Sequence, residues 1–397
     1  MTKKFVVVFI AVSVLLGVAP YVLVPPAWAK STRSSWEQAN PMNKARAFFV
    51  ATELKDGNIL VAGGFDGTSN PSFFADSEIY DRHTGSWKLA AAMHVARAAH
   101  VAVRLEDGRV LVIGGYTVGF NPLSSAEIYD PSTNMWSLTG SMNDARAEDF
   151  TAELLPGHKV LVAGGFGKSG VLKSAEIYGE ASGTWTRTSS MNVERAEFAT
   201  VVLRGEGRDE GNDGDDNRRI LVIGGYTNAG PIPTATAEIF DSATEMWTLT
   251  GSMNIGRADE AAVRLRDGRI LVAGAAVDSV PDATAAAEIF DPDTGQWATT
   301  ASMTSPRDEV EFAGVLLPDG RVLVPGGFTA LDTPVSSADL YDPKSRTWTQ
   351  AGSMSVSRGG HAVLVLRGDR GVLVMGGLNS PPAATASVDI FHEGEDE

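Results

Sequence analysis

The sequence of 397 residues contains no cysteine. Disulfide bonds, thiolate metal ligands, thiol nucleophiles and a lipoprotein-type thioether anchor are therefore excluded. Histidine is also scarce, with six residues spread widely and no H-E-x-x-H or similar metal-binding motif. A chain without such staples needs a large hydrophobic core, and its 43% of hydrophobic residues is sufficient for one.

Basic residues are few compared with acidic ones. Lys and Arg number 33, Asp and Glu number 49, and the formal net charge is −16. Phosphate binding needs a basic surface, so this balance argues against a nucleic-acid partner and against adsorption to anionic lipid. The excess of acid is typical of a solubilising surface. A cationic ligand or a metal is the alternative interpretation.

The first 29 residues differ in character from the rest of the chain. Lys3-Lys4 precedes an apolar run over residues 5–19, and the segment ends with Ala27-Trp28-Ala29. A basic start, an apolar stretch and a small-x-small site predict a signal peptide over residues 1–29 that is cleaved after Ala29. The alternative is an uncleaved membrane anchor over residues 5–24, which is nearly long enough to span a bilayer. Both interpretations predict an exported protein, whether periplasmic, at the cell surface or secreted.

A motif repeats through the remainder of the chain with a period of about fifty residues. Each unit contains an apolar run that ends in a glycine pair, usually after an Asp-Gly dipeptide, as expected of a tight β-hairpin. An acid–apolar–aromatic step follows, then in most units a Trp, a Met and an Arg. The glycine pairs are Gly63-Gly64, Gly114-Gly115, Gly164-Gly165, Gly224-Gly225, Gly326-Gly327 and Gly376-Gly377, with Gly274-Ala275 completing the series. The arginines are Arg46, Arg97, Arg146, Arg195, Arg257, Arg307 and Arg358.

This pattern resembles the Kelch family, through its glycine pair, its spaced Tyr and Trp and the Arg that opens the next unit. The resemblance covers residues 33–391 and implies a β-propeller with four-stranded blades. The family includes oxidases, epimerases, adhesion modules and scaffolds associated with actin or ligases, so it implies no single activity. A galactose-oxidase-like copper site is excluded, because the cross-linked cofactor of that enzyme needs a cysteine. A sialic-acid-epimerase-like mutarotase needs only acids, His and Arg, and stays open as an alternative.

The ends of the repeat predict how the ring closes. Counting the glycine pairs predicts an all-β fold of seven blades over residues 30–391, followed by an acidic tail at residues 392–397. Trp36 has no glycine pair before it, and the step Asp389-Ile-Phe391 has no Trp after it. We therefore expect the N-terminal strand around Trp36 to complete the last blade, which removes an open sheet edge.

One long insertion departs from the repeat. Residues 204–219 lengthen a hairpin of the fourth blade and place Asp213, Asp215 and Asn217 at alternating positions. A calcium-binding loop of the helix-loop-helix type would need Gly where Arg218 stands. We expect a flexible loop there, and no cofactor is predicted for the chain.

The Arg of each unit and the acid of each acid–apolar–aromatic step recur seven times. A ring of arginines at one mouth of the channel could bind an anion. The alternative is that each Arg pairs with a blade acid or with backbone carbonyls and locks neighbouring blades together. The matching numbers favour the second interpretation, because buried Arg is normally paired.

The residues just after the Arg break the seven-fold symmetry. The start of the innermost strand of a propeller blade lies at one mouth of the central channel, so we expect acids to crowd one sector of that mouth, with two histidines opposite. Crowded carboxylates raise one another's pKa, bind a cation or transfer protons. The alternative is that the acids only neutralise the arginines. The candidate site comprises Glu148, Asp149, Glu197, Asp259, Glu260, Asp308, Glu309, His100 and His361, bordered by Arg146, Arg195 and Arg257.

The loops on the same face vary most in composition. Phe73, Phe74 and Phe120 are expected to be exposed there, and prolines stiffen the loops at residues 230–233 and 380–382. Variable loops on a rigid scaffold are the usual binding surface, and aromatic side chains suit protein or sugar contact. The sequence therefore predicts an exported binding module for a protein or carbohydrate partner, with a sugar-modifying enzyme as the alternative.

Overall fold

The computed structural model describes residues 34–394, apart from 69, 204–216, 229, 231, 278–282, 311–312, 330–332, 367–370 and 380–382. The predicted signal peptide, most of the insertion, the loop at 380–382 and the end of the acidic tail lie outside the described residues. Every named element in the described part of the chain is a strand. That part contains no helix of the length and hydropathy needed to cross a membrane.

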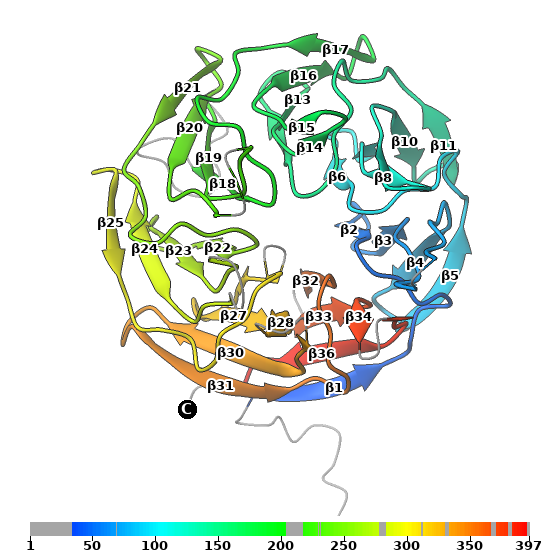
Figure 1. Ribbon diagram of the computed structural model, residues 1–397. Helices are drawn as coiled ribbons and strands as arrows, with labels where there is room; N and C mark the ends of the chain where they lie inside the picture. The colour runs from blue at the N-terminus through cyan, green and yellow to red at the C-terminus, as the bar shows by residue number, and fades with distance from the viewer. Residues whose placement is uncertain are drawn as a thin grey trace, which may run out of the picture.

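Seven four-stranded antiparallel sheets stand in a ring as the blades of a propeller, and Figure 1 views the ring along its central channel. We number the blades from one to seven in chain order, beginning with the sheet that contains β2. The strands nearest the channel are β2 (Val50–Glu53), β6 (Val101–Arg104), β12 (Thr151–Leu155), β18 (Ala199–Leu203), β22 (Ala261–Arg264), β26 (Val315–Leu316) and β32 (Ala362–Leu366). The second strands are β3 (Ile59–Ala62), β7 (Val110–Ile113), β13 (Lys159–Ala163), β19 (Arg219–Ile223), β23 (Ile270–Ala273), β27 (Val322–Pro325) and β33 (Gly371–Met375).

The outer half of each blade contains the aromatic residues of the repeat. The third strands are β4 (Ser77–Asp81), β10 (Ala126–Asp130), β16 (Ala175–Gly179), β20 (Ala237–Asp241), β24 (Ala287–Asp291), β30 (Ser337–Asp342) and β36 (Val388–His392). The outermost strands are β5 (Ser86–Ala90), β11 (Met135–Leu138), β17 (Thr184–Arg187), β21 (Met246–Leu249), β25 (Gln296–Thr299), β31 (Thr347–Ser353) and β1 (Ser35–Ala39). Four short hairpins extend the loops between second and third strands: β8 (Tyr116–Thr117) with β9 (Asn121–Pro122), β14 (Phe166–Gly167) with β15 (Gly170–Val171), β28 (Phe328–Thr329) with β29 (Thr333–Pro334), and β34 (Leu378–Asn379) with β35 (Ala383–Ala384).

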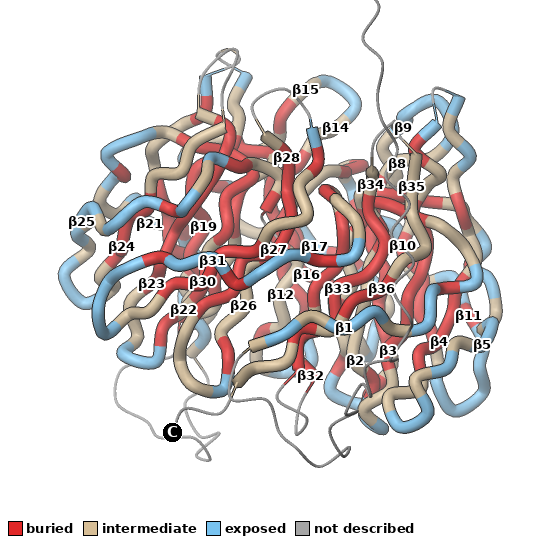
Figure 2. The backbone as a smooth tube through the Cα atoms, turned by 90° about the horizontal axis from the view of Figure 1, so that it is seen from below, coloured by how far each residue is buried: buried red, intermediate tan, exposed pale blue. Residues whose placement is uncertain are grey.

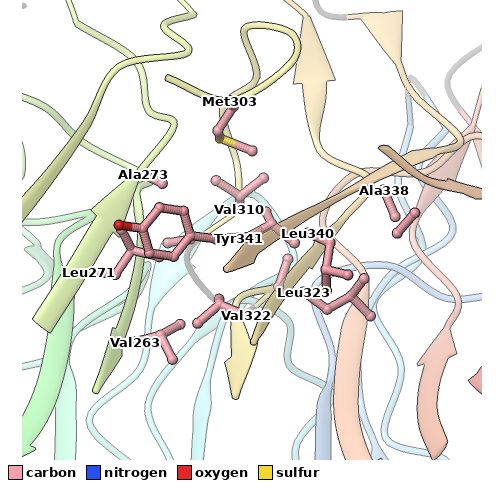
Figure 3. Packing of buried hydrophobic residues seen from close by; sticks show 14 of the residues in the cluster. Val263, Leu271, Ala273, Met303, Val310, Val322, Leu323, Ala338, Leu340 and Tyr341 are labelled. Atoms are coloured by element: carbon pink, nitrogen blue, oxygen red, sulfur yellow. The ribbon is translucent and has the colours of Figure 1, made fainter. Parts of the chain in front are cut away.

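The hydrophobic core lies between the faces of neighbouring blades. All four residues of β3 are buried, and the second strands read as continuous apolar runs because both faces of the sheet are covered. Figure 3 shows one such interface, in which Tyr341 of blade six lies beside Leu271 and Val263 of blade five. In Figure 2 the buried residues run through the inside of the blades, and the exposed ones gather at the turns.

The glycine pair after each second strand permits a close approach of backbones. Gly64 has a φ of 92°, and a Cβ there would lie 2.8 Å from the carbonyl oxygen of Ala47. Side chains other than glycine are strained in this conformation. Blade five has Ala275 at the second position of its pair, with a φ of 137°.

A buried ion pair fastens the connection before each innermost strand to the third strand. Arg46 is fully buried, and its Nη2 donates to Glu78 Oε1 at 2.9 Å while its Nη1 donates to the carbonyl of Asp76 at 3.1 Å. Glu78 Oε2 also accepts the backbone N–H of Asn43 at 2.7 Å. The arginines precede the innermost strands, since β2 begins only at Val50. The same pairing joins Arg97 to Glu127, Arg146 to Glu176, Arg195 to Glu238, Arg257 to Glu288, Arg307 to Asp339 and Arg358 to Asp389.

Tryptophan side chains join the outermost strands of adjacent blades. Trp87 Nε1 in β5 donates to the carbonyl of Asn40 at 2.9 Å. The sheet of blade seven has the order β1-β36-β33-β32, so it combines strands from both ends of the chain (Figure 1). Within it, Trp36 lies opposite Phe391 with ring centroids 5.2 Å apart. Trp36 Nε1 donates to the carbonyl of Ala351, in β31 of blade six, at 2.8 Å.

Candidate functional site

The residue two positions after each buried Arg belongs to a ring around the channel mouth, which we call the inner ring. On one side, Phe48 N–H donates to the carbonyl of Gly360 at 3.0 Å, and Ala99 N–H to that of Phe48 at 2.9 Å. On the other side, Asp259 N–H donates to the carbonyl of Glu197 at 3.0 Å. The members of the inner ring are Phe48, Ala99, Glu148, Glu197, Asp259, Glu309 and Gly360, all with φ between 47° and 58°.

Blades three to six each contribute an acid to the inner ring, and the structure brings these acids together. Tyr116 Oη donates to Glu148 Oε2 at 3.3 Å. Burial raises the pKa of Glu148, whose carboxyl group hydrogen-bonds that of Glu197. Burial also raises the pKa of Glu197 well above its ordinary value, and the nearby charges of Glu148, Asp149 and Glu309 raise it further. A raised pKa favours the protonated form, and a protonated carboxyl group can both donate and accept hydrogen bonds.

The next position, which we call the interblade position, places its side chain between neighbouring blades. His100 packs against Gly63 of blade one and Gly115 of its own blade. His100 and His361 are each 6% exposed, and their ring nitrogens have no hydrogen-bond partner among the described residues. The members of this position are Phe49, His100, Phe150, Phe198, Glu260, Val310 and His361.

The polar members of the interblade position are uncharged at neutral pH. Burial lowers the pKa of His361 to about 3, with the Arg358 charge adding to the effect, and it lowers the pKa of His100 well below its ordinary value. Burial raises the pKa of fully buried Glu260 to about 8, against the opposing effects of nearby amides and Arg257. His100 and His361 nevertheless line a cavity in the channel, whereas Glu260 is not among the described residues that line it.

Four other residues of the predicted site also take different positions. Asp308 directly follows its Arg, and its backbone pairs with Phe328, so it belongs to neither series. Arg146, Arg195 and Arg257 are fully buried and bound to acids of the third strands. Within the residues that the structure describes, no group of three or more His, Asp or Glu has an arrangement that could hold a metal ion.

A cavity of about 400 Å³ lies in the channel, against blades seven, one, two, three and four. Its walls are mostly apolar. Its lining includes two acidic residues, Asp149 and Glu153, and two threonines, Thr52 and Thr200. No Lys or Arg is among the described residues that line it.

Both cavity carboxyl groups have unusual proton affinities. Burial raises the pKa of Asp149 to about 7, and the charge of Glu148 adds to this rise. Burial likewise raises the pKa of Glu153 to about 7, while Arg218 opposes the rise. Perturbed carboxyl groups in a mostly apolar pocket are typical of binding and catalytic sites.

Glu153 was missed by the sequence reasoning, although the repeat contains a signal for it. In every blade one residue of the innermost strand pairs with the same leucine of the second strand, and Glu153 pairs with Leu161. An acid stands out at a position that otherwise holds apolar residues or threonine. The residues at this position are Thr52, Val103, Glu153, Val201, Val263, Val315 and Leu364.

Aromatic rings form a continuous row from the inner ring to the loop face above blades one and two. We call Phe48, Phe65, Phe73, Phe120 and Tyr116 the aromatic strip. Its successive ring centroids are 5.7 Å apart for Phe48 and Phe65, 6.0 Å for Phe65 and Phe73, 5.5 Å for Phe73 and Phe120, and 5.9 Å for Phe120 and Tyr116.

The three phenylalanines expected on the loops have different environments. Phe120 is 56% exposed and Phe73 is half-buried. Phe74 was expected to be exposed but is buried, with Lys44 Nζ 3.9 Å from its ring centroid. Consecutive residues point to opposite sides of an extended segment, so only one of Phe73 and Phe74 can face outward.

Comparison with known proteins agrees with this architecture. Residues 97–143 and 312–355 match the family model of the Kelch motif. No curated protein matches the sequence. The structure is similar to that of a novel fungal alcohol oxidase with catalytic diversity among the AA5 family, in complex with copper, at 18% identity and a TM-score of 0.71, covering 91% of this chain and 76% of that one. It is also similar to YjhT, at 15% identity and a TM-score of 0.59, covering 79% of this chain and 99% of that one.

At these identities the likeness to solved structures concerns the fold alone. The Kelch motif matches lie in two separate parts of the ring. The Arg and the acid recur in all seven blades, and the glycine pair recurs in six of them. The chain is a β-propeller of seven four-stranded blades, and two stretches of it match the Kelch motif.

Proposed function

We propose that this Kelch propeller is a binding module whose aromatic strip receives a carbohydrate or protein partner. The observation that carries the proposal is Phe120, a large apolar side chain that is 56% exposed at a hairpin tip. Its φ is 53°, directly after Gly119 at 76°. A left-handed conformation costs about 1–3 kcal/mol for a residue other than glycine. Strain of this kind gathers at ligand-binding positions, where presentation of a side chain offsets it.

The chemistry around the strip suits a sugar. Stacked aromatic faces at Phe65 and Phe73 can receive the apolar C–H face of a sugar ring. Tyr116 joins the strip to the carboxyl group of Glu148, which can bond sugar hydroxyls. The same exposed aromatics can anchor a protein loop. The net charge of −16 disfavours an acidic partner of either kind.

The test compares ligand capture by the wild type and by Phe120→Ser on a glycan array and in a pull-down from cell-envelope extract. The matched control is Leu89→Ser, because Leu89 is 72% exposed on the outermost strand of blade one. We expect Phe120→Ser to weaken binding by at least about tenfold and Leu89→Ser to leave it unchanged. Equal effects of both substitutions, or no ligand in either assay, would overturn the proposal.

One observation favours a second candidate, a sugar-modifying enzyme. The pKa values of Asp149 and Glu153 are both about 7, which suits groups that exchange protons near neutral pH. The absence of Lys and Arg from the described cavity wall favours a neutral sugar over the anionic sialic acid. The test is the rate at which the anomers of neutral sugars interconvert. Acceleration by the wild type that is lost in Asp149→Asn would support the enzyme, and no acceleration would exclude it.

A further inference from the structure

The channel cavity is lined by two acidic residues and by no Lys or Arg among the described residues. Asp149 and Glu153 both line it, and neither side chain forms an ion pair with a described residue. Thr151 of β12 is hydrogen-bonded to Thr200 of β18 at 3.0 Å between hydroxyl oxygens, which holds the strand of Glu153 against blade four. Glu153 therefore belongs to a strand that is held in place. A buried carboxylate is costly unless it is paired, so the cavity wall is incomplete in electrostatic terms.

The charged groups near these two carboxyls offer little compensation. Glu148 and Glu197 lie close to Asp149 and are acids themselves. The positive charge of Arg218, the residue before β19, lowers the pKa of Glu153 but does not offset the effect of burial. His100 and His361, which also line the cavity, are neutral because burial lowers their pKa. The surroundings repel anions and attract cations.

The rest of the cavity is apolar and accessible to a compact group. Val101, Leu364 and Phe48 supply aliphatic and aromatic walls. On the cavity side, the inner ring has the small residues Ala99 and Gly360. In blades four and five, the same ring has the acids Glu197 and Asp259 instead. An aromatic face next to carboxylates is the arrangement by which proteins bind organic ammonium groups.

We propose that the channel cavity is a binding site for a small organic cation, whose ammonium group pairs with Asp149 and Glu153 and whose apolar body packs against Phe48 and the aliphatic wall. The ligand supplies the charge that the cavity lacks. This site is separate from the exposed end of the aromatic strip, and it stands whether or not Phe120 binds a partner.

Binding of such a cation is linked to pH. The carboxyl groups titrate near pH 7 in the empty cavity, and a cation binds their ionised form. Binding therefore releases a proton, and the affinity rises with pH. If one carboxyl group must ionise, the affinity at pH 8 is about tenfold higher than at pH 6.

The experiment is isothermal titration of the full chain with choline and with 3,3-dimethylbutan-1-ol, its uncharged isostere. We expect choline to bind and the alcohol to bind at least about tenfold more weakly. Glu153→Gln and Asp149→Asn should each lower the affinity for choline by about tenfold or more. Asp293→Asn, at an exposed carboxyl group in the turn between β24 and β25, should leave it unchanged.

Three results would overturn this site: no choline binding at millimolar concentrations, equal binding of both probes, or unchanged choline affinity in Glu153→Gln. Thermal unfolding monitored by circular dichroism confirms that each variant is folded. Phe120→Ser should retain choline binding, so failure of the loop-face proposal and failure of the cation site give different results.

Discussion

At the scale of single residues, the molecule contains two kinds of buried polar group. The repeated arginines and acids are paired, as Arg195 is to Glu238 at 2.9 Å with both side chains fully buried. The polar residues of the interblade position have no such partner. His361 occupies a place that Phe49, Phe150 and Phe198 fill in other blades, so the fold does not need an imidazole there. We call the paired residues that recur in every blade the frame. Pairing therefore distinguishes residues of the frame from residues that depart from the repeat.

The frame predicts a large loss of stability when a pair is broken. Glu238→Gln leaves the Arg195 guanidinium buried without its counter-charge, which costs about 3–5 kcal/mol. The measurement is the free energy of unfolding in urea at pH 7. Asp293→Asn, at an exposed carboxyl group, serves as control and should change it by less than about 0.5 kcal/mol. A loss below about 1 kcal/mol for Glu238→Gln would mean that the pair does not hold the blade.

The unpaired histidines predict a specific pH dependence. The pKa of folded His361 is about 3, below the ordinary 6.5, so the unfolded chain binds more protons and stability falls as pH decreases from about 6.5 toward 3. His361→Phe removes this loss, and its advantage over the wild type should grow by about 2 kcal/mol between pH 7 and pH 4.5. Urea unfolding at both pH values measures it. His83→Phe, at an exposed histidine, should show no such growth, and equal curves for both variants would contradict the assignment.

At the scale of strands, β1 has an unusual position. It comes from the start of the chain, pairs with β36 through five residues, and contacts blade six through Trp36. Each outermost strand makes an equivalent Trp bond to the blade before it, as Trp348 does to Ala301 at 2.9 Å. Loss of β1 would leave β36 as an open edge and remove two of these links between blades.

Deletion of residues 30–41 should therefore destabilise the whole ring. We expect a fall in the unfolding midpoint of at least about 10 °C, with greater aggregation through the open edge. Differential scanning calorimetry measures the midpoint, and deletion of residues 30–33 alone is the control. An unchanged midpoint in the longer deletion would show that β1 contributes nothing to stability.

The strands were predictable because each blade repeats the same local signals. An apolar run such as Ile59–Ala62 with a glycine pair after it can only be a strand covered on both faces. Side-chain direction at the channel mouth was not predictable. Asp259 and Glu260 are neighbours in sequence, but a φ of 58° at Asp259 sends the next side chain between blades. Blade three has one extra residue, Asp149, which shifts the pattern and brings a carboxyl group into the cavity.

At the scale of the whole molecule, acids occupy one sector of a ring whose frame is seven-fold. Glu148, Glu197, Asp259 and Glu309 follow one another around the inner ring, while Phe48, Ala99 and Gly360 fill the remainder. The field of such a sector favours cations and polar neutral ligands over anions. Regularity of the frame is what makes this asymmetry recognisable as a binding feature.

We also propose that the ring acts outside the cytoplasm. The basic, apolar and small-x-small segments of residues 1–29 support export with cleavage after Ala29. The mature protein should then begin at Lys30, which N-terminal sequencing of the protein recovered from the cell envelope or medium tests. Recovery of the intact segment in the membrane fraction would favour an anchor instead, and recovery of the whole protein from the cytoplasm would contradict export.

The central claim is that repeated residues hold the ring, while departures from the repeat serve binding at a cost in stability. The pKa of folded Glu153 is about 7, above the ordinary value for Glu, so its ionisation destabilises the fold as pH rises beyond about 4.5. The most direct measurement is the free energy of unfolding of Glu153→Gln at pH 8. The account predicts that this variant is more stable than the wild type by about 3 kcal/mol, and that the gain disappears at pH 4. A loss of stability at pH 8, like that expected of Glu238→Gln, would make Glu153 part of the frame and contradict the claim.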